Sequence, residues 1–562
     1  MASRWKIAFY LIAPWAACTV AGVSSAPSPE ATRWEWTPPF NGTGVVCSAC
    51  RGTSQVLIAL AHLTGTVRWI IEKICVVFYL HDAYDCTQLV DVGYSQFWTI
   101  LTTVVVNKNQ VCSFLFSDCG TFYQFWNQKW SLDIPADKPS VQSSSEAQIP
   151  ADAAKLRVLH LTDIHWDLQY VAGSEAACPR KTLCCRSFPA DDAKVKQPAG
   201  YWGTVARCDL PYRTVENLFQ QLSSKEKFDL IYWTGDLIDH SWPDINKATT
   251  IRQLRKLAAL FRHYFPATRV FSAIGNHDVV PFNFFPVGTG RKKYKLNWLY
   301  GELPAIWRAE EPKQTSDIRR RASYSKRVFP GLRLISLNTN YNLEHNFWVF
   351  LNQTDPERSL HWLRDELLAA ERAGEKVHLL AHQGLLRDSS WSQNLYRLIN
   401  RFESTITALL HGHEHFDQFA VYYEGARPSA VSFMTPSVTT SQFRNPSYRV
   451  FTFDGPRDHS TWKMLDFDTY TLDVEAASRR QTQAPRWQLE YSAKRDYGMR
   501  DLSPSEWHRL VGRLKSDNDL FDKFLKHFNS GAPLDCDASC RADLLGRLQA
   551  PIDGHPHPRS AL

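Results

Sequence analysis

The sequence predicts a multidomain protein with a small all-α domain, a larger layered α/β domain and a helical C-terminal region. Three observations predict this organisation. Six cysteines are spaced among helical apolar stretches near the N-terminus, short apolar strands alternate with helical segments in the middle, and apolar stripes at helical spacing follow near the C-terminus. At 562 residues the chain is also too long for one ordinary domain.

The composition limits the classes of function. Hydrophobic residues make up 44% and charged residues 22%, so the chain can build packed cores and is not globally disordered. The net charge of +7 comes without the concentrated basic runs of a nucleic-acid-binding protein, and we expect no nucleic-acid partner. The 19 histidines would add positive charge at acidic pH.

Residues 1–26 are typical of a signal peptide. Arg4 and Lys6 precede an apolar run over residues 7–20, and small residues at 24–26 offer a cleavage site. The alternative is a membrane anchor, but Pro14 and the shortness of the apolar run weigh against it. We therefore expect a secreted and/or lysosomal protein.

The cysteines and two sequons agree with that compartment. Cleavage removes Cys18 and leaves an even number of cysteines, which is typical of disulfide-bonded proteins in an oxidising compartment. Sequons at Asn41 and Asn352 predict N-glycosylation.

The first cysteine cluster has two cysteines close together at each end and two in the middle: Cys47 and Cys50, Cys112 and Cys119, and Cys75 and Cys86. A Cys-x-x-Cys element can be a zinc half-site or a redox motif, but this symmetrical spacing suits helices joined at both ends. Residues 43–122 resemble the saposin-B family, whose small helical domains bind lipid. The alternative is a disulfide-stabilised helical domain without a lipid role. The resemblance implies the pairs Cys47–Cys119, Cys50–Cys112 and Cys75–Cys86.

Residues 123–154 have the composition of a linker. They are rich in Pro, Ser and Ala from residue 131 onward and poor in large apolar side chains, so we expect a partly extended segment between two cores. The layered α/β domain should occupy residues 155–470.

Five apolar strands of that domain end in polar clusters. We expect them at residues 156–161, 228–233, 270–274, 377–381 and 406–410, with a helix around 360–368. Ligands of layered α/β domains collect at the carboxyl ends of the strands. The residues that follow these strands are therefore the candidate site.

The polar clusters carry the donor types that hold a pair of divalent metals. In extended chain, residues two apart face the same way, so Asp163 and His165 can converge on one ion. Glycines beside the clusters allow sharp turns and close approach of the backbone. The candidates are Asp163, His165, Asp236, Asn276, His382, His413 and His415.

These elements in this order resemble the calcineurin-like metallophosphoesterase family over about residues 157–420. The resemblance implies a four-layer α/β sandwich, in which helices flank two β-sheets. It also implies two metal ions per chain, with Asp236 as the bridge, and we expect both ions to be Zn²⁺. Leu237, Ile238, Asp239 and His240 follow the bridge, where the iron-containing purple acid phosphatases have a tyrosine ligand; manganese remains the alternative metal. The first ion would be bound by Asp163, His165 and His415, and the second by Asn276, His382 and His413.

The same chemistry predicts a mechanism. Two metals would acidify a bridging water to hydroxide, which attacks phosphorus in line. The alkoxide leaving group needs a proton, and we expect His277 first and His240 second to supply it. The alternative for His240 is a hydrogen bond to a metal ligand.

The last part of the chain, residues 471–550, predicts docked helices. Ser503-Pro504-Ser505-Glu506 reads as a capping box with proline at the first helical position. Apolar stripes follow over residues 507–514 and 521–528. We expect the proline-rich tail 551–562 to be disordered.

The order of these parts, and the local stretches 163–167, 235–240, 435–439 and 445–450, resemble the acid sphingomyelinase family. That resemblance implies the disulfides Cys178–Cys184, Cys185–Cys208 and Cys536–Cys540. It implies hydrolysis of sphingomyelin to ceramide and phosphocholine at acidic pH. Positive charge at acidic pH would hold the enzyme to anionic lipid surfaces, and we infer no obligate protein partner.

Two alternatives remain open. Acid sphingomyelinases commonly have glutamate at the position of Asp278. Aspartate at this position is typical of the related branch of soluble nucleotide and phosphodiester hydrolases. A lipid-transfer protein with an inert phosphoesterase fold would lack ligands, whereas all seven candidates are present.

Overall fold

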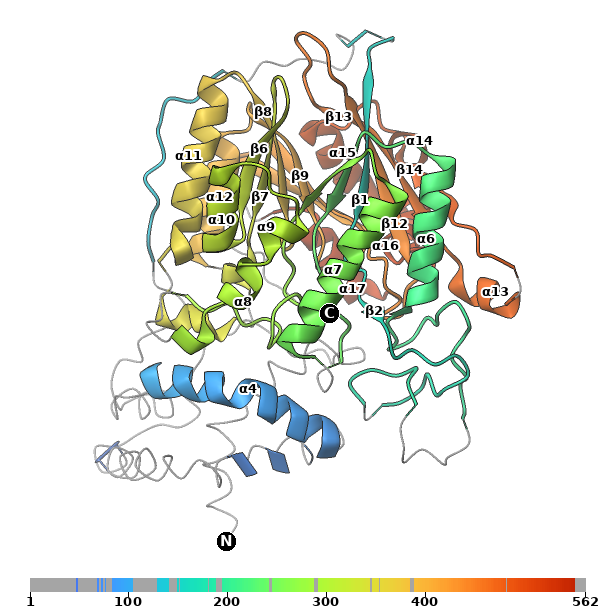
Figure 1. Ribbon diagram of the computed structural model, residues 1–562. Coiled ribbons are helices and arrows are strands. Elements are labelled where there is room, and N and C mark those ends of the chain that lie inside the picture. The colour runs from blue at the N-terminus through green and yellow to red at the C-terminus, as the bar shows by residue number, and fades with distance from the viewer. Residues whose placement is uncertain are drawn as a thin grey trace.

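The structure is a computed structural model of the chain (Figure 1). Residues 1–26, the sequon at Asn41, most of residues 43–122 and the tail 551–562 lie outside the described part, so the predictions made for them stay predictions. The described residues are 47–48, 68–69, 72–73, 76, 83–104, 129–140, 149–150, 152–179, 181–187, 195–241, 245–287, 292–343, 346–352, 354–384, 389–481 and 483–550.

The first of two large sheets has the strand order β14-β13-β12-β1-β4-β5. Strands β1, β4 and β5 are parallel, and β12 joins β1 in antiparallel register. The strand bounds are β1 (Lys155–Leu161), β4 (Leu230–Trp233), β5 (Arg269–Ser272), β12 (Ser447–Asp454), β13 (Met464–Thr471) and β14 (Gln488–Ser492).

The second sheet has the order β10-β11-β9-β8-β7-β6. Its four central strands are parallel, and the edge strands β10 and β6 are antiparallel to their neighbours. The bounds are β6 (Tyr324–Phe329), β7 (Leu332–Leu337), β8 (Lys376–Ala381), β9 (Ile406–His411), β10 (Gln418–Glu424) and β11 (Arg427–Met434). All five strands expected from the sequence are present.

The two sheets pack face to face. The Tyr232 hydroxyl of β4 lies 2.9 Å from Nδ1 of His378 on β8, and the Ser336 hydroxyl of β7 donates to the carbonyl oxygen of Ser272 on β5. Helices cover the outer faces (Figure 1): α6 (Tyr212–Lys225) and α7 (Lys247–Tyr264) on the first sheet, α11 (Ser359–Arg372) and α12 (Ser390–Arg401) on the second. This layered α/β sandwich was expected.

Shorter elements connect β5 to β6 and β7 to α11. The two-stranded pair β2 (Trp166–Asp167) and β3 (Leu210–Pro211) lies beside the first sheet. The connecting elements are η2 (Lys292–Tyr294), α8 (Asn297–Tyr300), α9 (Leu303–Ile306), α10 (Pro312–Arg321), η3 (Asn340–Asn342), η4 (Phe347–Leu351) and η5 (Pro356–Arg358).

The C-terminal region shares the core of the sandwich. Trp507 of α15 is buried against Phe419 and Phe433 of the second sheet and Phe467 of the first. The region expected to be helical also contributes β14. Its helices are α13 (Val474–Arg479), α14 (Ala493–Tyr497), α15 (Pro504–Ser516), α16 (Asn518–Phe528) and α17 (Ala538–Arg547).

The predicted capping box at Ser503 was wrong in one half. The Ser503 hydroxyl accepts from the Glu506 N–H, as expected. The Ser503 N–H, however, donates to Asp501, and the Glu506 carboxylate pairs with Arg500. In a full capping box the Ser503 N–H would donate to the Glu506 carboxylate. Here Asp501 accepts from Ser503 instead, and Glu506 binds Arg500.

Two N-terminal pieces lie against the sandwich. Helix α4 (Ala83–Val104) lies at one end of the sandwich (Figure 1) and contacts η4. Its Gln96 accepts a hydrogen bond from the Trp348 indole. Residues 129–140, within the expected linker, run extended along α12, where the Leu132 N–H donates to Asn394. Among the described residues, no helix has the length and hydropathy that crossing a bilayer requires.

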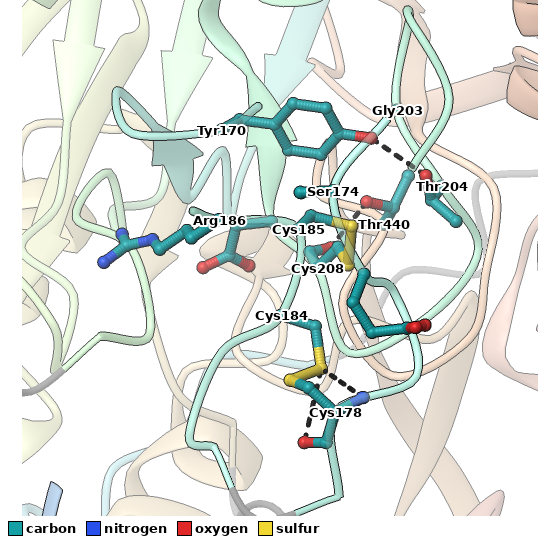
Figure 2. The surroundings of a disulfide bond; sticks show 12 residues. Tyr170, Ser174, Cys178, Cys184, Cys185, Arg186, Gly203, Thr204, Cys208 and Thr440 are labelled. Carbon is teal, nitrogen blue, oxygen red and sulfur yellow. Dashed lines mark hydrogen bonds between the residues drawn. A yellow bond between two sulfur atoms is a disulfide. The ribbon is translucent and has the colours of Figure 1, made fainter. Parts of the chain in front are cut away.

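Disulfides stabilise the long segment between β2 and β3. The expected pairs Cys178–Cys184 and Cys185–Cys208 are present (Figure 2), as is Cys536–Cys540. Cys47 and Cys86 are also disulfide-bonded, but the pairs expected for residues 47–119 involve residues outside the described part.

Candidate metal centre

All seven candidate side chains meet at one end of the sandwich. The parallel strands of both sheets end there, so the loops that follow them converge. Donor atoms gather in three groups within 4.8 Å: His165, His240 and His415; Asp236, His382 and His413; and Asp163, His165 and Asp236. The Asn276 amide oxygen joins them, 2.8 Å from Nε2 of His382 and 2.8 Å from Nδ1 of His413. His411, the last residue of β9, lies near the ligands His413 and His415 in the sequence but is in none of the three groups.

Asp236 lies between the two expected sets of ligands. Its Oδ2 is 3.5 Å from Nε2 of His165 and 3.2 Å from Nε2 of His382. On the side of the first set, Oδ1 of Asp163 is 3.4 Å from Nε2 of His415. A carboxylate in this position can bind two ions at once.

The histidine tautomers suit metal binding. Nδ1 of His165 donates to the carbonyl oxygen of Ile238 at 2.6 Å, and Nδ1 of His382 donates to that of Thr234 at 2.7 Å. In its neutral form each ring directs the lone pair of Nε2 into the centre. Burial lowers the pKa of His382, but Asp236 outweighs it and raises that pKa to about 9, so a metal ion would have to displace the Nε2 proton of His382. Within the described structure, the buried Nε2 of His165 has no hydrogen-bond partner. The residues therefore fit a divalent metal.

The two carboxylates are held in their ionised form. Burial would raise the pKa of Asp163, but His415 and His382 outweigh it and hold that pKa below the ordinary value. Burial also opposes ionisation of Asp236, whose pKa is lowered mainly by His382 and then by His277. Both groups can therefore serve as anionic ligands.

The backbone of the first ligand pair differs from expectation. Asp163 and His165 are not extended but left-handed, with φ of 49° and 36°. The Asp163 N–H donates to the carbonyl oxygen of Gly235, and the His165 N–H to that of Asp236. The two side chains converge because bonds to the neighbouring loop impose this turn, not because an extended strand places them on one face.

Glycines make room for the ligands. A Cβ at Gly275 would lie 2.0 Å from Oδ1 of Asp236, and one at Gly412 would lie 2.5 Å from Oδ2 of Asp163. Neither distance is possible between non-bonded atoms. These two positions must stay glycine if Asp163 and Asp236 are to keep their places.

Asp278 organises the turn that carries Asp236. Its carboxylate accepts hydrogen bonds from the N–H groups of Asp236, Leu237 and Gly275 at 2.8–3.2 Å. Burial and the charge of Asp236 nevertheless raise the pKa of Asp278 to about 6. The bridging loop is therefore supported from within the fold.

The two expected proton donors flank this centre. The His240 ring is tilted over His165 with 4.0 Å between centroids, and the His277 ring stacks on Phe282 at 4.4 Å. Burial lowers the pKa of His240, but Asp209 outweighs it and raises that pKa. Burial lowers the pKa of His277 to about 3.

The sequence did not reveal the partner of His240. Both the backbone N–H and Nδ1 of His240 bond to the carboxylate of Asp209, at 2.7 Å and 2.8 Å. Asp209 lies beside the disulfide-bonded Cys208, and no spacing rule connects it with a residue 31 positions away. The only hint was its position next to that cysteine.

A buried acidic cluster lies next to His240. Arg186 donates to both carboxylate oxygens of Asp167 at 2.8 Å and reaches Asp239 at 2.9 Å. Burial raises the pKa of Asp239 to about 7 although Arg186 opposes this shift. Arg186 is adjacent to Cys185, which forms a disulfide with Cys208 (Figure 2). Asp209 follows Cys208 in the sequence, so this disulfide links the cluster to Asp209.

The chain is similar to known phosphoesterases. The model of the calcineurin-like phosphoesterase family matches residues 156–417, and that of the acid sphingomyelin phosphodiesterase C-terminal region matches residues 428–549. Sphingomyelin phosphodiesterase of Bos taurus is 34% identical over 92% of this chain and 83% of its own length. Sphingomyelin phosphodiesterase 1 of Caenorhabditis elegans is 35% identical, over 79% of each chain. Human acid sphingomyelinase-like phosphodiesterase 3b is 27% identical, over 68% of this chain and 85% of its own length.

We predict that Gly275→Ala disrupts the centre while the fold survives. The new methyl group must displace Asp236, so bound metal and phosphodiesterase activity should each fall by about 10-fold or more. Metal content after gel filtration and turnover of a phosphodiester measure the effect. Gly512→Ala is the control, because a Cβ at this helical position meets no atom within 4 Å. Full metal content in Gly275→Ala would contradict the assignment of Asp236.

Proposed function

Because the chain belongs to the sphingomyelin phosphodiesterase family, we propose that it hydrolyses sphingomyelin to ceramide and phosphocholine. The observation that carries the proposal is the position of the Asp236 carboxylate between two sets of imidazole, carboxylate and amide donors. In this reaction the bond between phosphorus and the ceramide oxygen breaks, and water supplies the new oxygen on phosphorus.

We propose Zn²⁺ as the metal, with two ions per chain. The donors are mainly imidazole nitrogens with two carboxylates and one amide, a set that suits zinc, while manganese prefers more oxygen ligands. Such ions supply Lewis acidity toward the phosphoryl oxygens and lower the pKa of water. Asp163, His165 and His415 would bind one ion, Asn276, His382 and His413 the other, and Asp236 both.

The proton for the ceramide alkoxide would come from His240 or His277. Asp209 bonds to Nδ1 of His240, which fixes the ring and stabilises its charged form. The backbone N–H of His277 donates to Oδ1 of Asp236 at 2.7 Å, which holds His277 beside the bridging carboxylate. The charge around the two rings favours His240 as the donor, the reverse of the order expected from the sequence.

Acidic conditions suit the buried carboxyl groups. Asp239 and Asp278 have raised pKa values, about 7 and about 6, because burial penalises their charged forms. At a pH below these values both carboxyl groups are protonated, so the folded protein does not bear the free-energy cost of burying their negative charges. At neutral pH it bears that cost. With the disulfides at residues 178–208 and 536–540, this supports a secreted and/or lysosomal enzyme.

A lipid substrate agrees with the position of α4. Besides Gln96, Asp85 of this helix accepts from the Thr182 N–H, so α4 connects η4 with the disulfide-bonded segment. Trp69 and Tyr84 are exposed large apolar side chains in the same part of the chain. We propose that this part, expected to be saposin-like, brings the enzyme to sphingomyelin in anionic membranes.

The second candidate is a hydrolase of soluble nucleotides or other phosphodiesters. Asp278 and the similarity to acid sphingomyelinase-like phosphodiesterase 3b favour it. The greater identity to sphingomyelin phosphodiesterases, over 92% of this chain, favours the lipid substrate.

A direct comparison of substrates tests the proposal. At about pH 5, the purified protein should hydrolyse sphingomyelin in vesicles containing anionic lipid at least about 10-fold faster than a soluble nucleotide phosphodiester. Chelation should abolish turnover, and Zn²⁺ should restore it better than Mn²⁺. Phosphocholine release measures the reaction. Faster turnover of the nucleotide would establish the second candidate instead.

The choice of leaving group tests the proton donors. His240→Ala and His277→Ala should each slow sphingomyelin hydrolysis, and the true donor by about 10²- to 10⁴-fold. Hydrolysis of a 4-nitrophenyl phosphodiester should change much less, because nitrophenolate leaves without a proton. The exposed His263→Ala is the control. Equal losses on both substrates would rule out proton donation.

We predict that Asp239→Asn flattens the pH dependence of stability. The pKa of Asp239 is about 7 in the folded protein and 3.8 in the unfolded chain, so the folded state binds the extra proton between these values. The free energy of unfolding contributed by this group is therefore highest near pH 4 and falls as pH rises to 7. The variant should lose less stability over that window, by on the order of 1–2 kcal/mol. Urea denaturation at both pH values measures this, with exposed Asp522→Asn as control.

A further inference from the structure

The ring that follows His415 is enclosed by two planar groups. The Phe416 ring stacks on Phe528 with 4.3 Å between centroids and 10° between planes. The guanidinium carbon of Arg444 lies 3.5 Å from the centre of the same ring. Two groups this close must cover opposite faces, so Phe416 lies between Phe528 of α16 and Arg444 of the loop before β12. We call these three residues the Phe416 stack.

Hydrogen bonds tie the same three segments together. The Asp417 N–H, one residue after Phe416, donates to the carbonyl oxygen of Phe528 at 3.0 Å. Nδ2 of Asn445 donates to the carbonyl oxygen of Ser530 at 3.2 Å. The end of α16 is therefore bonded to the metal-ligand loop and also to the segment that carries Arg444.

Arg444 is unusually costly to bury. It is 0% exposed, and Nη2 donates to the side chain of Gln442, but within the described structure Nε and Nη1 have no hydrogen-bond partner. The stack with Phe416 and the negative charges of Asp163 and Glu414 offset part of this cost. A guanidinium held in this way is fixed in place chiefly by the ring it covers.

The loop that carries Arg444 is also strained. Gln442 and Phe443 both have φ of 62°, and a residue with a Cβ takes up this conformation only when its surroundings enforce it. These two positive φ angles turn the chain so that Arg444 lies over the Phe416 ring. His415 itself has φ of 62°, so its side chain depends on the same neighbours for its direction.

We propose that the Phe416 stack is a positioning device for His415, through which the last turn of α16 sets the affinity of the first metal site. The ring of Phe416 cannot turn between its two neighbours, and this fixes the backbone from which His415 reaches toward Asp163. The inference rests on the two-metal site of the proposed function. It gives the C-terminal helices a role in metal binding although they contribute no ligand.

Two phenylalanines of α16 offer a matched test. Phe521 and Phe528 are each 2% exposed, but Phe521 packs against Phe524 and Arg541, away from the ligand loop. Phe528→Ala should release one Zn²⁺ at a chelator concentration about 10- to 100-fold lower than the wild type, with the second ion retained. Phe521→Ala should keep both ions at wild-type affinity. Phe528→Tyr, which preserves the ring, should also keep both ions.

The readout is zinc per chain across a chelator series, with circular dichroism to confirm folding. If Phe528→Ala does not fold, Phe528→Leu serves in its place, because leucine fills the site without a flat face to stack. Wild-type zinc affinity in Phe528→Ala or Phe528→Leu would overturn the inference, as would equal losses in Phe521→Ala. A wild-type chain that binds no zinc would refute the proposed metal site and the inference with it. Two tightly bound ions without sphingomyelin turnover would refute only the substrate.

Discussion

The centre depends on backbone conformations that ordinary residues avoid. Five of the seven candidate ligands have positive φ: 49° at Asp163, 36° at His165, 60° at Asp236, 71° at His413 and 62° at His415. Each such residue costs about 1–3 kcal/mol unless the surrounding structure imposes the conformation. The sharp turns are what allow short loops to direct several side chains to one point. The rest of the sandwich must therefore hold these loops in place.

That support crosses between loops that are distant in the sequence. The Thr439 N–H donates to the carbonyl oxygen of Asp163, and the Ser437 N–H to that of His415, both at 3.0 Å. Farther out, Arg449 of β12 and the Tyr491 hydroxyl of β14 both bond to the buried carboxylate of Asp417. A removed partner would leave a charge buried without compensation, which is strongly destabilising. The antiparallel half of the first sheet thus anchors the ligand loop of the second sheet.

The sequence predicted those parts of the molecule that local pattern determines. Apolar strands followed by polar residues indicated β1, β4, β5, β8 and β9 and the side chains at their ends, because burial and donor chemistry can be read within a few residues. Asp209, Arg444 and β14 were not predicted as parts of this architecture. Their roles come from contacts with residues far away in the chain, such as His240 and Phe416, and no local spacing records such contacts.

The distribution of ligands over both sheets has a consequence for folding. Asp236 comes from the first sheet and His382 from the second, and their closest side-chain atoms are 3.2 Å apart only after the sheets have packed. Before that step, neither half offers a complete set of donors for either of the two proposed ions, so metal binding would follow docking of the sheets. A ligand that binds only the folded state stabilises it by mass action. The ions would then offset the free-energy cost of the strained loops that hold them. Unfolding separates the sheets and relaxes the loops, so it would also release the ions.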